Sequence, residues 1–110
     1  MIILTNEQKK LNLIGLSFKA GKIVSGEDLV IKAMQQKKVK IVFVASDSSP
    51  QTIDKFEKKC FFYNVEVNGE FNTDQLSKAI GKPMRKIVAM TDKGFYEAFK
   101  RIKEVNNNES

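Results

Sequence analysis

The stretch Lys40-Ile-Val-Phe-Val-Ala-Ser46 decides the fold of this chain. Its β-branched and aromatic residues are typical of a strand, and they form a continuous apolar run. A strand with one face in water would alternate apolar with polar residues, so this run predicts a central strand that is covered on both faces. Helices must therefore flank the predicted sheet on two sides.

Two helices and a short strand are predicted before this stretch. The segment Thr5 to Gln8 resembles a capping box, and apolar residues then recur at mainly helical spacing, which predicts a first helix from about Asn6 to Ala20. Ile23-Val24 predicts a short extended piece. A second helix is predicted from Gly26 to Gln36, and its inward residues are expected to be Leu29, Val30, Ala33 and Met34.

A third helix follows the central strand. Asp47, Ser48 and Ser49 offer capping oxygens immediately before Pro50, a residue well suited to the first turn, so a helix is predicted from Pro50 to about Phe62. A short strand, Val65 to Val67, and a turn at Asn68-Gly69 come next.

The last part of the chain repeats the alternation. Thr73 is expected to cap a small helix that ends at Gly81, and the apolar run Lys86 to Thr91 predicts another strand. Asp92 is expected to cap the final helix, and the tail from Asn106 to Ser110 is expected to fray. The resulting order α-β-α-β-α-β-α-β-α predicts an α/β fold, a three-layer α/β/α sandwich around a mixed sheet.

Length and composition favour one domain and a polyanionic partner. The 110 residues include 42% apolar residues, enough for a single core, and we expect one domain over residues 1–105. The 19 Lys and Arg residues outnumber the 13 Asp and Glu residues, giving a net charge of +6 that favours nucleic acid as a partner. No stretch is long and apolar enough for a signal segment or a membrane helix, and the single Cys60 favours a reducing, cytoplasmic location.

The chain has no histidine, the commonest general base, and this argues against a catalytic function. With one cysteine, no thiolate zinc site can be assembled, and we expect no metal, no cofactor and no small-molecule substrate. The run from Gly15 to Lys22 invites comparison with a phosphate-binding Walker loop, but five residues separate its glycines and Ile23 replaces the required Ser or Thr. Cys60 has no histidine to activate it, and Asp47 and Asp92 are explained as helix caps. A nucleotide-using enzyme stays a minor alternative.

Two segments could meet an anion. The run from Ala20 to Lys32 opens a helix, whose unpaired N–H groups and positive dipole end favour phosphate, and it includes Lys22. The stretch between Asp74 and Asp92 has no acidic residue, and its cations surround Gly81 and Pro83: Lys78, Lys82, Arg85 and Lys86. The cluster Lys37 to Lys40 is interpreted as a solvated turn.

These segments together resemble the ribosomal-protein L-seven-Ae and L-thirty-e superfamily of kink-turn RNA-binding proteins, particularly its small bacterial members. The residues that carry the resemblance run from Leu13 to Lys32, from Lys40 to Ala45, from Asp47 to Pro50 and from Leu76 to Gly81. The resemblance implies that the start of the second helix recognises sheared G·A pairs in kinked RNA, while the loop before the last strand shields flipped bases. By resemblance the first surface would comprise Gly26, Glu27, Asp28 and Lys32, and the second Ile80, Gly81, Lys82, Pro83, Met84 and Arg85.

The chain departs from the archaeal pattern at two positions. That pattern has Asn and then Glu where this chain has Asp28 and Leu29. Asp28 accepts hydrogen bonds but cannot donate them, and Leu29 does neither. We expect a non-catalytic protein that binds structured RNA, with ribosomal RNA and ribosomal proteins as candidate partners. The alternative is a protein-interaction module on the same fold, with Leu29 and Met84 in an exposed apolar patch.

Overall fold

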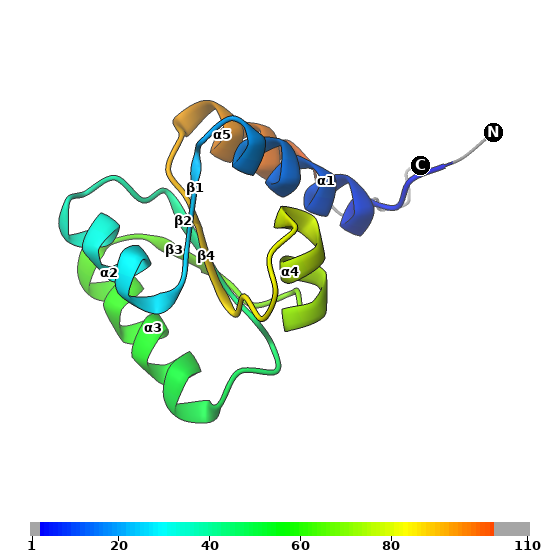
Figure 1. Cartoon of the computed structure of the whole chain (residues 1–110). Helices are drawn as coiled ribbons and strands as arrows, with labels where there is room; N and C mark the ends of the chain where they lie inside the picture. The colour runs from blue at the N-terminus through cyan, green and yellow to red at the C-terminus, as the bar shows by residue number, and fades with distance from the viewer. Residues whose placement is uncertain (1–2, 103–110) are drawn as a thin grey trace, which may run out of the picture.

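The computed structural model describes residues 3–102, and within that range helices and strands alternate as predicted (Figure 1). The tail Asn106 to Ser110 lies outside the described residues. The elements in chain order are α1 (Asn6–Lys19), β1 (Ile23–Ser25), α2 (Glu27–Gln35), β2 (Ile41–Val44), α3 (Pro50–Tyr63), β3 (Glu66–Asn68), α4 (Thr73–Ile80), β4 (Ile87–Met90) and α5 (Lys93–Arg101).

The four strands form one mixed sheet in the order β1-β4-β2-β3. Strand β2 pairs with β3 in parallel, with Ile41 opposite Glu66, and with β4 in the antiparallel sense, with Val44 opposite Ile87. Strand β1 is also antiparallel to β4. Strands β1, β2 and β3 therefore run in one direction and β4 runs in the other.

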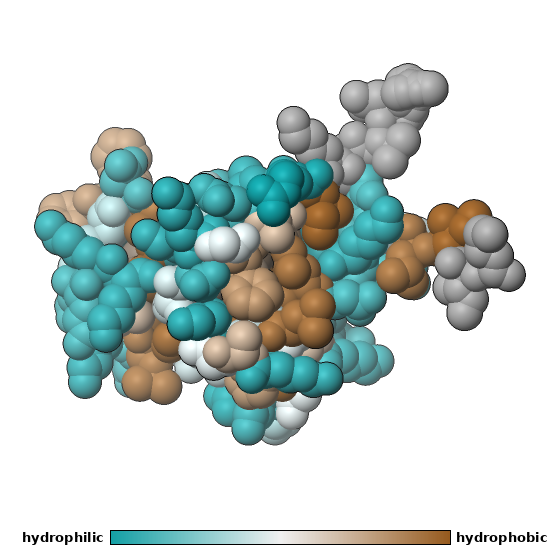
Figure 2. Space-filling view, turned by 90° about the horizontal axis from the view of Figure 1, so that it is seen from above, coloured by the Kyte–Doolittle hydropathy of each residue, from teal (hydrophilic) through white to brown (hydrophobic). Residues whose placement is uncertain are grey.

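Helices cover both faces of the sheet, as the continuous apolar run predicted. Helices α1, α4 and α5 lie on one side, and α2 and α3 lie on the other (Figure 1). Every residue of β2 and β4 is buried. Seen from above, the α1 and α5 side shows a run of apolar side chains between hydrophilic ones (Figure 2). The predicted three-layer α/β/α sandwich is confirmed.

The strand side chains alternate between two apolar cores. Phe43 points toward α5 and α4, where its ring centroid lies 5.1 Å from that of Phe99 and 6.2 Å from that of Phe71. Ile14 of α1 belongs to the same core. On the opposite face Val42 and Val44 pack with residues of α2 and α3, among them Val30, Met34, Phe56 and Cys60.

Three helices are capped by a predicted residue, and the capping roles of Thr73 and Asp47 are corrected by the structure. Thr5 forms the expected capping box with Gln8, and the Asp92 side chain accepts from the Phe95 N–H. Thr73 is the first residue of α4, not its cap, because the Asn72 side chain accepts from Gln75 one position earlier.

Helix α3 is capped by Ser49, one of the three predicted capping residues, so the other correction concerns Asp47. The Asp47 carboxylate lies across the chain at Thr73 instead. Asp47 therefore stabilises the start of α4, a helix that begins 26 residues later in the sequence.

The inward face of α2 is also corrected at one position. Val30, Ala33 and Met34 are buried as predicted, but the Leu29 side chain is 61% exposed. Leu29 lies over β1, which is a three-residue strand at the edge of the sheet. Within residues 3–102 no further strand covers that edge, and Leu29 is at the surface.

The strand directions bring three helix starts to the same end of the molecule. Strands β1, β2 and β3 run in one direction and lead into α2, α3 and α4, so these helices all begin beyond the carboxyl ends of the strands (Figure 1, bottom). We call this the helix-start end, and the opposite end of the sheet the strand-start end. In open α/β sheets, ligands bind at the end where strands lead into helix N-termini.

Candidate nucleic-acid interface

One backbone hydrogen bond joins the two predicted surfaces. The N–H of Gly26 donates to the carbonyl of Ile87 at 2.9 Å. Gly26 is the cap residue of α2, and Ile87 directly follows residues 81–86, which we call the basic loop. The start of α2 and the end of the basic loop therefore lie side by side at the helix-start end.

Gly26 leaves the start of α2 open. Its φ of 97° and ψ of 146° are a conformation that residues with a side chain rarely adopt. Gly26 has no side chain with which to cap the helix, and no side-chain cap bond is formed there. The first N–H groups of α2 are thus available to an anion.

The two acids at this helix start differ in their surroundings. Glu27 Oε1 pairs with Nζ of Lys55 on α3 at 3.2 Å, and both side chains are about half exposed. An exposed pair of this kind adds little stability, but it offsets the charge of Glu27 toward an approaching anion. Asp28 is exposed.

The basic loop is held against α4. Gly81 ends α4 in the left-handed conformation, and the Arg85 N–H donates to Ser77 Oγ at 2.8 Å. Met84 adopts a φ of 52° and its side chain is 74% exposed. A left-handed conformation at a residue with a side chain is costly, so the surrounding contacts fix this loop in a defined shape.

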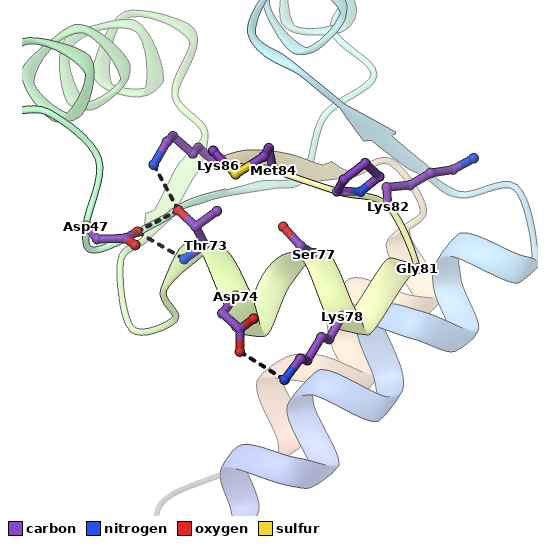
Figure 3. A pocket seen from close by; sticks show the side chains of 10 residues that line it. Asp47, Thr73, Asp74, Ser77, Lys78, Gly81, Lys82, Met84 and Lys86 are labelled. Carbon is purple, nitrogen blue, oxygen red and sulfur yellow. Dashed lines mark hydrogen bonds and ion pairs between the residues drawn. The ribbon is translucent and has the colours of Figure 1, made fainter.

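A pocket of about 680 Å³ opens between α4 and the basic loop (Figure 3). Asp47 Oδ1 accepts hydrogen bonds from Thr73 Oγ1 at 2.6 Å and from the Thr73 N–H at 3.0 Å. Lys86 Nζ donates to Thr73 Oγ1 at 3.1 Å. Hydrogen bonds from the Thr73 hydroxyl and N–H, with the nearby Lys86 charge, hold the pKa of Asp47 below its ordinary value.

The mouth of this pocket combines apolar and cationic groups. Pro83 and Met84 line it together with Lys78 and Lys82. Lys78 pairs with Asp74 at 3.2 Å in the exposed part of α4. Lys82 Nζ lies 5.8 Å from the centroid of the Phe18 ring of α1. Sequence reasoning missed Thr73 and Ser77 as lining residues, and Asp47 was assigned to the wrong helix.

Several predicted residues lie together, and three lie apart. Gly26, Glu27 and Asp28 lie beside the end of the basic loop. The side chain of Ile80, by contrast, is 4% exposed and packs in the core. Lys22 lies at the other end of β1, where its carbonyl accepts from the Thr91 N–H at 3.0 Å.

Lys32 lies beside a second groove. This groove, of about 460 Å³, follows α2 and the edge strand β1, and its polar lining includes Lys32, Gln36 and Lys38 but no carboxylate. The exposed Leu29 belongs to this groove, whereas Gly81 belongs to the pocket along α4. The structure thus places Lys82 at the pocket, Lys32 at the groove and Lys22 at neither.

The described residues include one buried thiol and dispersed carboxylates. Burial raises the pKa of the Cys60 thiol to about 11, which opposes its use as a nucleophile. Between residues 3 and 102 no three His, Cys, Asp or Glu side chains gather as a metal site would require. Among the helices of the same range, none has the length and apolarity needed to cross a membrane.

Known proteins resemble this chain in both sequence and structure. It is 41% identical over 99 residues to the RNA-binding protein YlxQ of Enterococcus faecium, covering 90% of this chain and 95% of that protein. It is 42% identical over 83 residues to the RNA-binding protein YlxQ of Bacillus subtilis strain 168, covering 76% and 83% of the two chains.

Solved structures agree with this fold. A Bacillus halodurans protein of unknown function superposes with a TM-score of 0.81 at 34% identity, covering 86% of this chain and 95% of its own. The Giardia lamblia 15.5kD RNA binding protein shares the fold with a TM-score of 0.76 at 15% identity, covering 92% and 88%. The profile of the ribosomal protein L7Ae/L30e/S12e/Gadd45 family matches residues 8–100, and the chain belongs to that family.

Proposed function

We propose that this protein is a non-catalytic RNA-binding protein that binds kinked RNA at its helix-start end. The observation that carries the proposal is the hydrogen bond from Gly26 to Ile87, which sets the open start of α2 beside the basic loop. The names of its YlxQ relatives, both RNA-binding proteins, support RNA as the partner.

The geometry offers one element for phosphate and another for an unpaired base. The free N–H groups at the start of α2, together with nearby lysines, would bind phosphates of the RNA backbone. Phosphate contacts of this kind position nucleic acid on a protein. The pocket beside α4 has an apolar rim at Pro83 and Met84, against which a base displaced from a bend would pack. Distorted RNA, rather than a regular duplex, presents both features at once.

The RNA is expected to belong to a ribosome or another ribonucleoprotein in the cytoplasm. Family membership supports this choice, because the family takes its description from ribosomal proteins. The net charge of +6 favours a large polyanion. Asp28, which cannot donate a hydrogen bond, is expected to change the preferred pairs at the kink relative to the archaeal pattern.

The test compares a kink-turn RNA with a straight duplex of equal length in mobility-shift titrations at several salt concentrations. We expect tighter binding of the kinked RNA, with an affinity that falls as salt rises because phosphate contacts release counterions. The variant Lys78→Ala/Lys82→Ala, whose lysines line the pocket at this end, should weaken binding and reduce the logarithmic salt slope by about 1.5.

A control variant removes the same charge elsewhere. Lys9→Ala/Lys93→Ala changes two exposed lysines that line neither the pocket nor the groove, and it should bind almost as the unaltered protein does. Equal loss in both double variants would mean that net charge alone drives binding. Unchanged affinity in Lys78→Ala/Lys82→Ala would contradict the assigned site.

The second candidate is a protein-interaction module. The exposure of Leu29 and Met84, at 61% and 74%, favours it, because apolar side chains of this size are usually buried unless they meet a partner. The same titrations separate the two functions. A protein-interaction module would bind the kinked RNA and the straight duplex equally weakly.

A further inference from the structure

Two adjacent phenylalanines are exposed at the strand-start end of the molecule. The side chains of Phe61 and Phe62, in the last turn of α3, are 88% and 77% exposed. Most large apolar side chains of a small domain lie in its core, and here the neighbouring Phe56 and Cys60 of the same helix do so. The exposed side chains of Phe61 and Phe62 are therefore a candidate contact surface for a partner.

The exposure belongs to a well-formed helix end. Asn64 ends α3 in the left-handed conformation with a φ of 58°. The Asn64 N–H donates to the carbonyl of Phe61, and the Val65 N–H donates to the carbonyl of Cys60 at 2.8 Å. The Phe62 ring also meets Tyr63 edge to face, with centroids 4.9 Å apart. The backbone hydrogen bonds fix the helix end that carries both rings, and the contact with Tyr63 positions the Phe62 ring.

Lysines of α3 and of the turn between α2 and β2 lie at the same end of the molecule as the two rings. Ile41 lies opposite Glu66 in parallel strands, so the turns that lead from α2 into β2 and from α3 into β3 enter the sheet at the same end. No Asp or Glu occurs in residues 29–46, and α3 carries two carboxylates, Asp54 and Glu57, the second one helical turn before Phe61. We define the aromatic end as Phe61 and Phe62 with five lysines of the same end of the molecule: Lys37, Lys38, Lys40, Lys58 and Lys59.

The surface view agrees with this composition. Figure 2 looks onto the strand-start end, and on its left, where α2 and α3 lie in Figure 1, apolar side chains stand among hydrophilic ones. One of these lysines, Lys58, pairs with Asp54 at 3.0 Å in an exposed i,i+4 pair. Such a pair opens easily to a stronger anion.

We propose that the aromatic end is a second RNA-contact surface, which binds an unpaired strand by stacking bases on Phe61 and Phe62. Exposed aromatic faces beside lysines are the features that single-strand binding surfaces combine. Charge favours RNA over an apolar protein patch, since a protein partner would have to remove water from several lysines without supplying phosphates. Stacking on an aromatic side chain strengthens binding about 5- to 150-fold per base.

The distance between the two surfaces permits one RNA to reach both. Helix α3 has 14 residues and runs from the helix-start end to the aromatic end. At about 1.5 Å per residue its length is about 20 Å, a span that a few unpaired nucleotides can cover. A kinked RNA with a single-stranded flank would then bind at two sites, and the second contact would form at high effective concentration.

The test uses three RNAs: the kink-turn RNA alone, the same RNA with an unpaired tail of about ten nucleotides carrying 2-aminopurine, and the free tail. With the intact protein, the tail should raise affinity at least tenfold, and stacking should quench 2-aminopurine fluorescence. The variant Phe61→Ala/Phe62→Ala should remove both effects and leave binding of the kink-turn RNA alone unchanged.

Two further variants control for ring chemistry and for apolar surface. Phe61→Tyr/Phe62→Tyr keeps the aromatic faces and should keep the tail effect. Leu16→Ala removes another exposed apolar side chain, on α1, and should change nothing. If the tail adds no affinity, or if Phe61→Ala/Phe62→Ala retains the effect, the proposal is wrong.

Protein association is the remaining outcome. If sedimentation shows that the intact chain self-associates and the double alanine variant does not, the rings form a protein contact and the proposal is overturned. Binding and quenching of the free tail are measured separately from the kink-turn RNA. The aromatic end can therefore stand or fall independently of the proposed function.

Discussion

The two ends of the sheet offer an RNA contrasting kinds of surface. At the helix-start end hydrogen bonds fix the backbone. The Gly26 N–H donates to the carbonyl of Ile87, and the Arg85 N–H of the basic loop donates to Ser77 Oγ. At the aromatic end the contact groups are exposed side chains on a helix terminus and a turn. A fixed backbone selects a ligand by shape, whereas long lysines and aromatic faces accept many sequences. The first end is therefore suited to specificity and the second to added affinity.

The largest expected effects on stability and RNA binding come from replacing Gly26 at the helix-start end, with Gly21 at the strand-start end as its control. Gly26→Ala places a side chain at a φ of 97° without a clash, so the expected loss of about 1–3 kcal/mol in unfolding free energy comes from the backbone conformation alone. Urea unfolding measures that loss, and a mobility shift at a temperature where the variant is folded should show weaker binding of kinked RNA.

Gly21→Ala is the matched control for that experiment. Gly21 also has a positive φ, 75°, with open space around it, but it lies before β1 at the strand-start end. We expect a similar loss of stability, about 1–2 kcal/mol, and unchanged affinity for kinked RNA. Equal RNA-binding losses in both variants would show that stability, not the shape of the helix start, limits binding.

Asp28→Asn should sharpen the specificity of the helix-start end. The change removes a negative charge near phosphate and adds hydrogen-bond donors, so affinity for kink-turn RNA should rise about fivefold. Asp54→Asn removes the same charge from an exposed position on α3 and should raise that affinity less. If the two variants gain equally in a competition mobility shift, the donor at residue 28 has no role.

Low pH should loosen the helix-start end through Asp47. Its folded-state pKa lies below the ordinary value of 3.8, so the folded protein binds fewer protons than the unfolded chain in that range. This stabilisation is present at higher pH and is lost as the pH falls from about 4 through the lowered pKa. The urea midpoint should drop over that interval, and the drop should shrink in Asp47→Asn. An equal drop in both proteins would assign it to other carboxylates.

Local signals in the sequence predicted most of the fold. The apolar run at β2, the capping box at Thr5 and the cap at Asp92 each act within a few residues, and each was confirmed. The side chains of Asn72 and Thr73 are both able to cap a helix. In the structure Asn72 is the cap and Thr73 is the first helical residue. Helix ends are the least certain part of such a prediction because neighbouring residues offer similar chemistry.

Contacts between distant segments could not be predicted from local sequence patterns. Asp47 binds Thr73 across the fold, and Leu29 is exposed because a short edge strand leaves it uncovered. The division of Lys22 and Lys32 from the basic loop follows from the direction of β1, which no local pattern reveals. The candidate interface was therefore predicted as a set of residues, while its grouping required the tertiary structure.

The pairing of β1 with β4 has a consequence for synthesis of the chain. Gly26 finds its partner only at Ile87, and Ile14 packs in a core that includes Leu76 and Phe99. At translation rates of about 5–20 residues per second, the first helix and the helix-start end must wait on the order of ten seconds for these partners to emerge. A nascent chain that stops before β4 would lack the hydrogen bond from Gly26 to Ile87, so the helix-start end can form only after β4 has been synthesised.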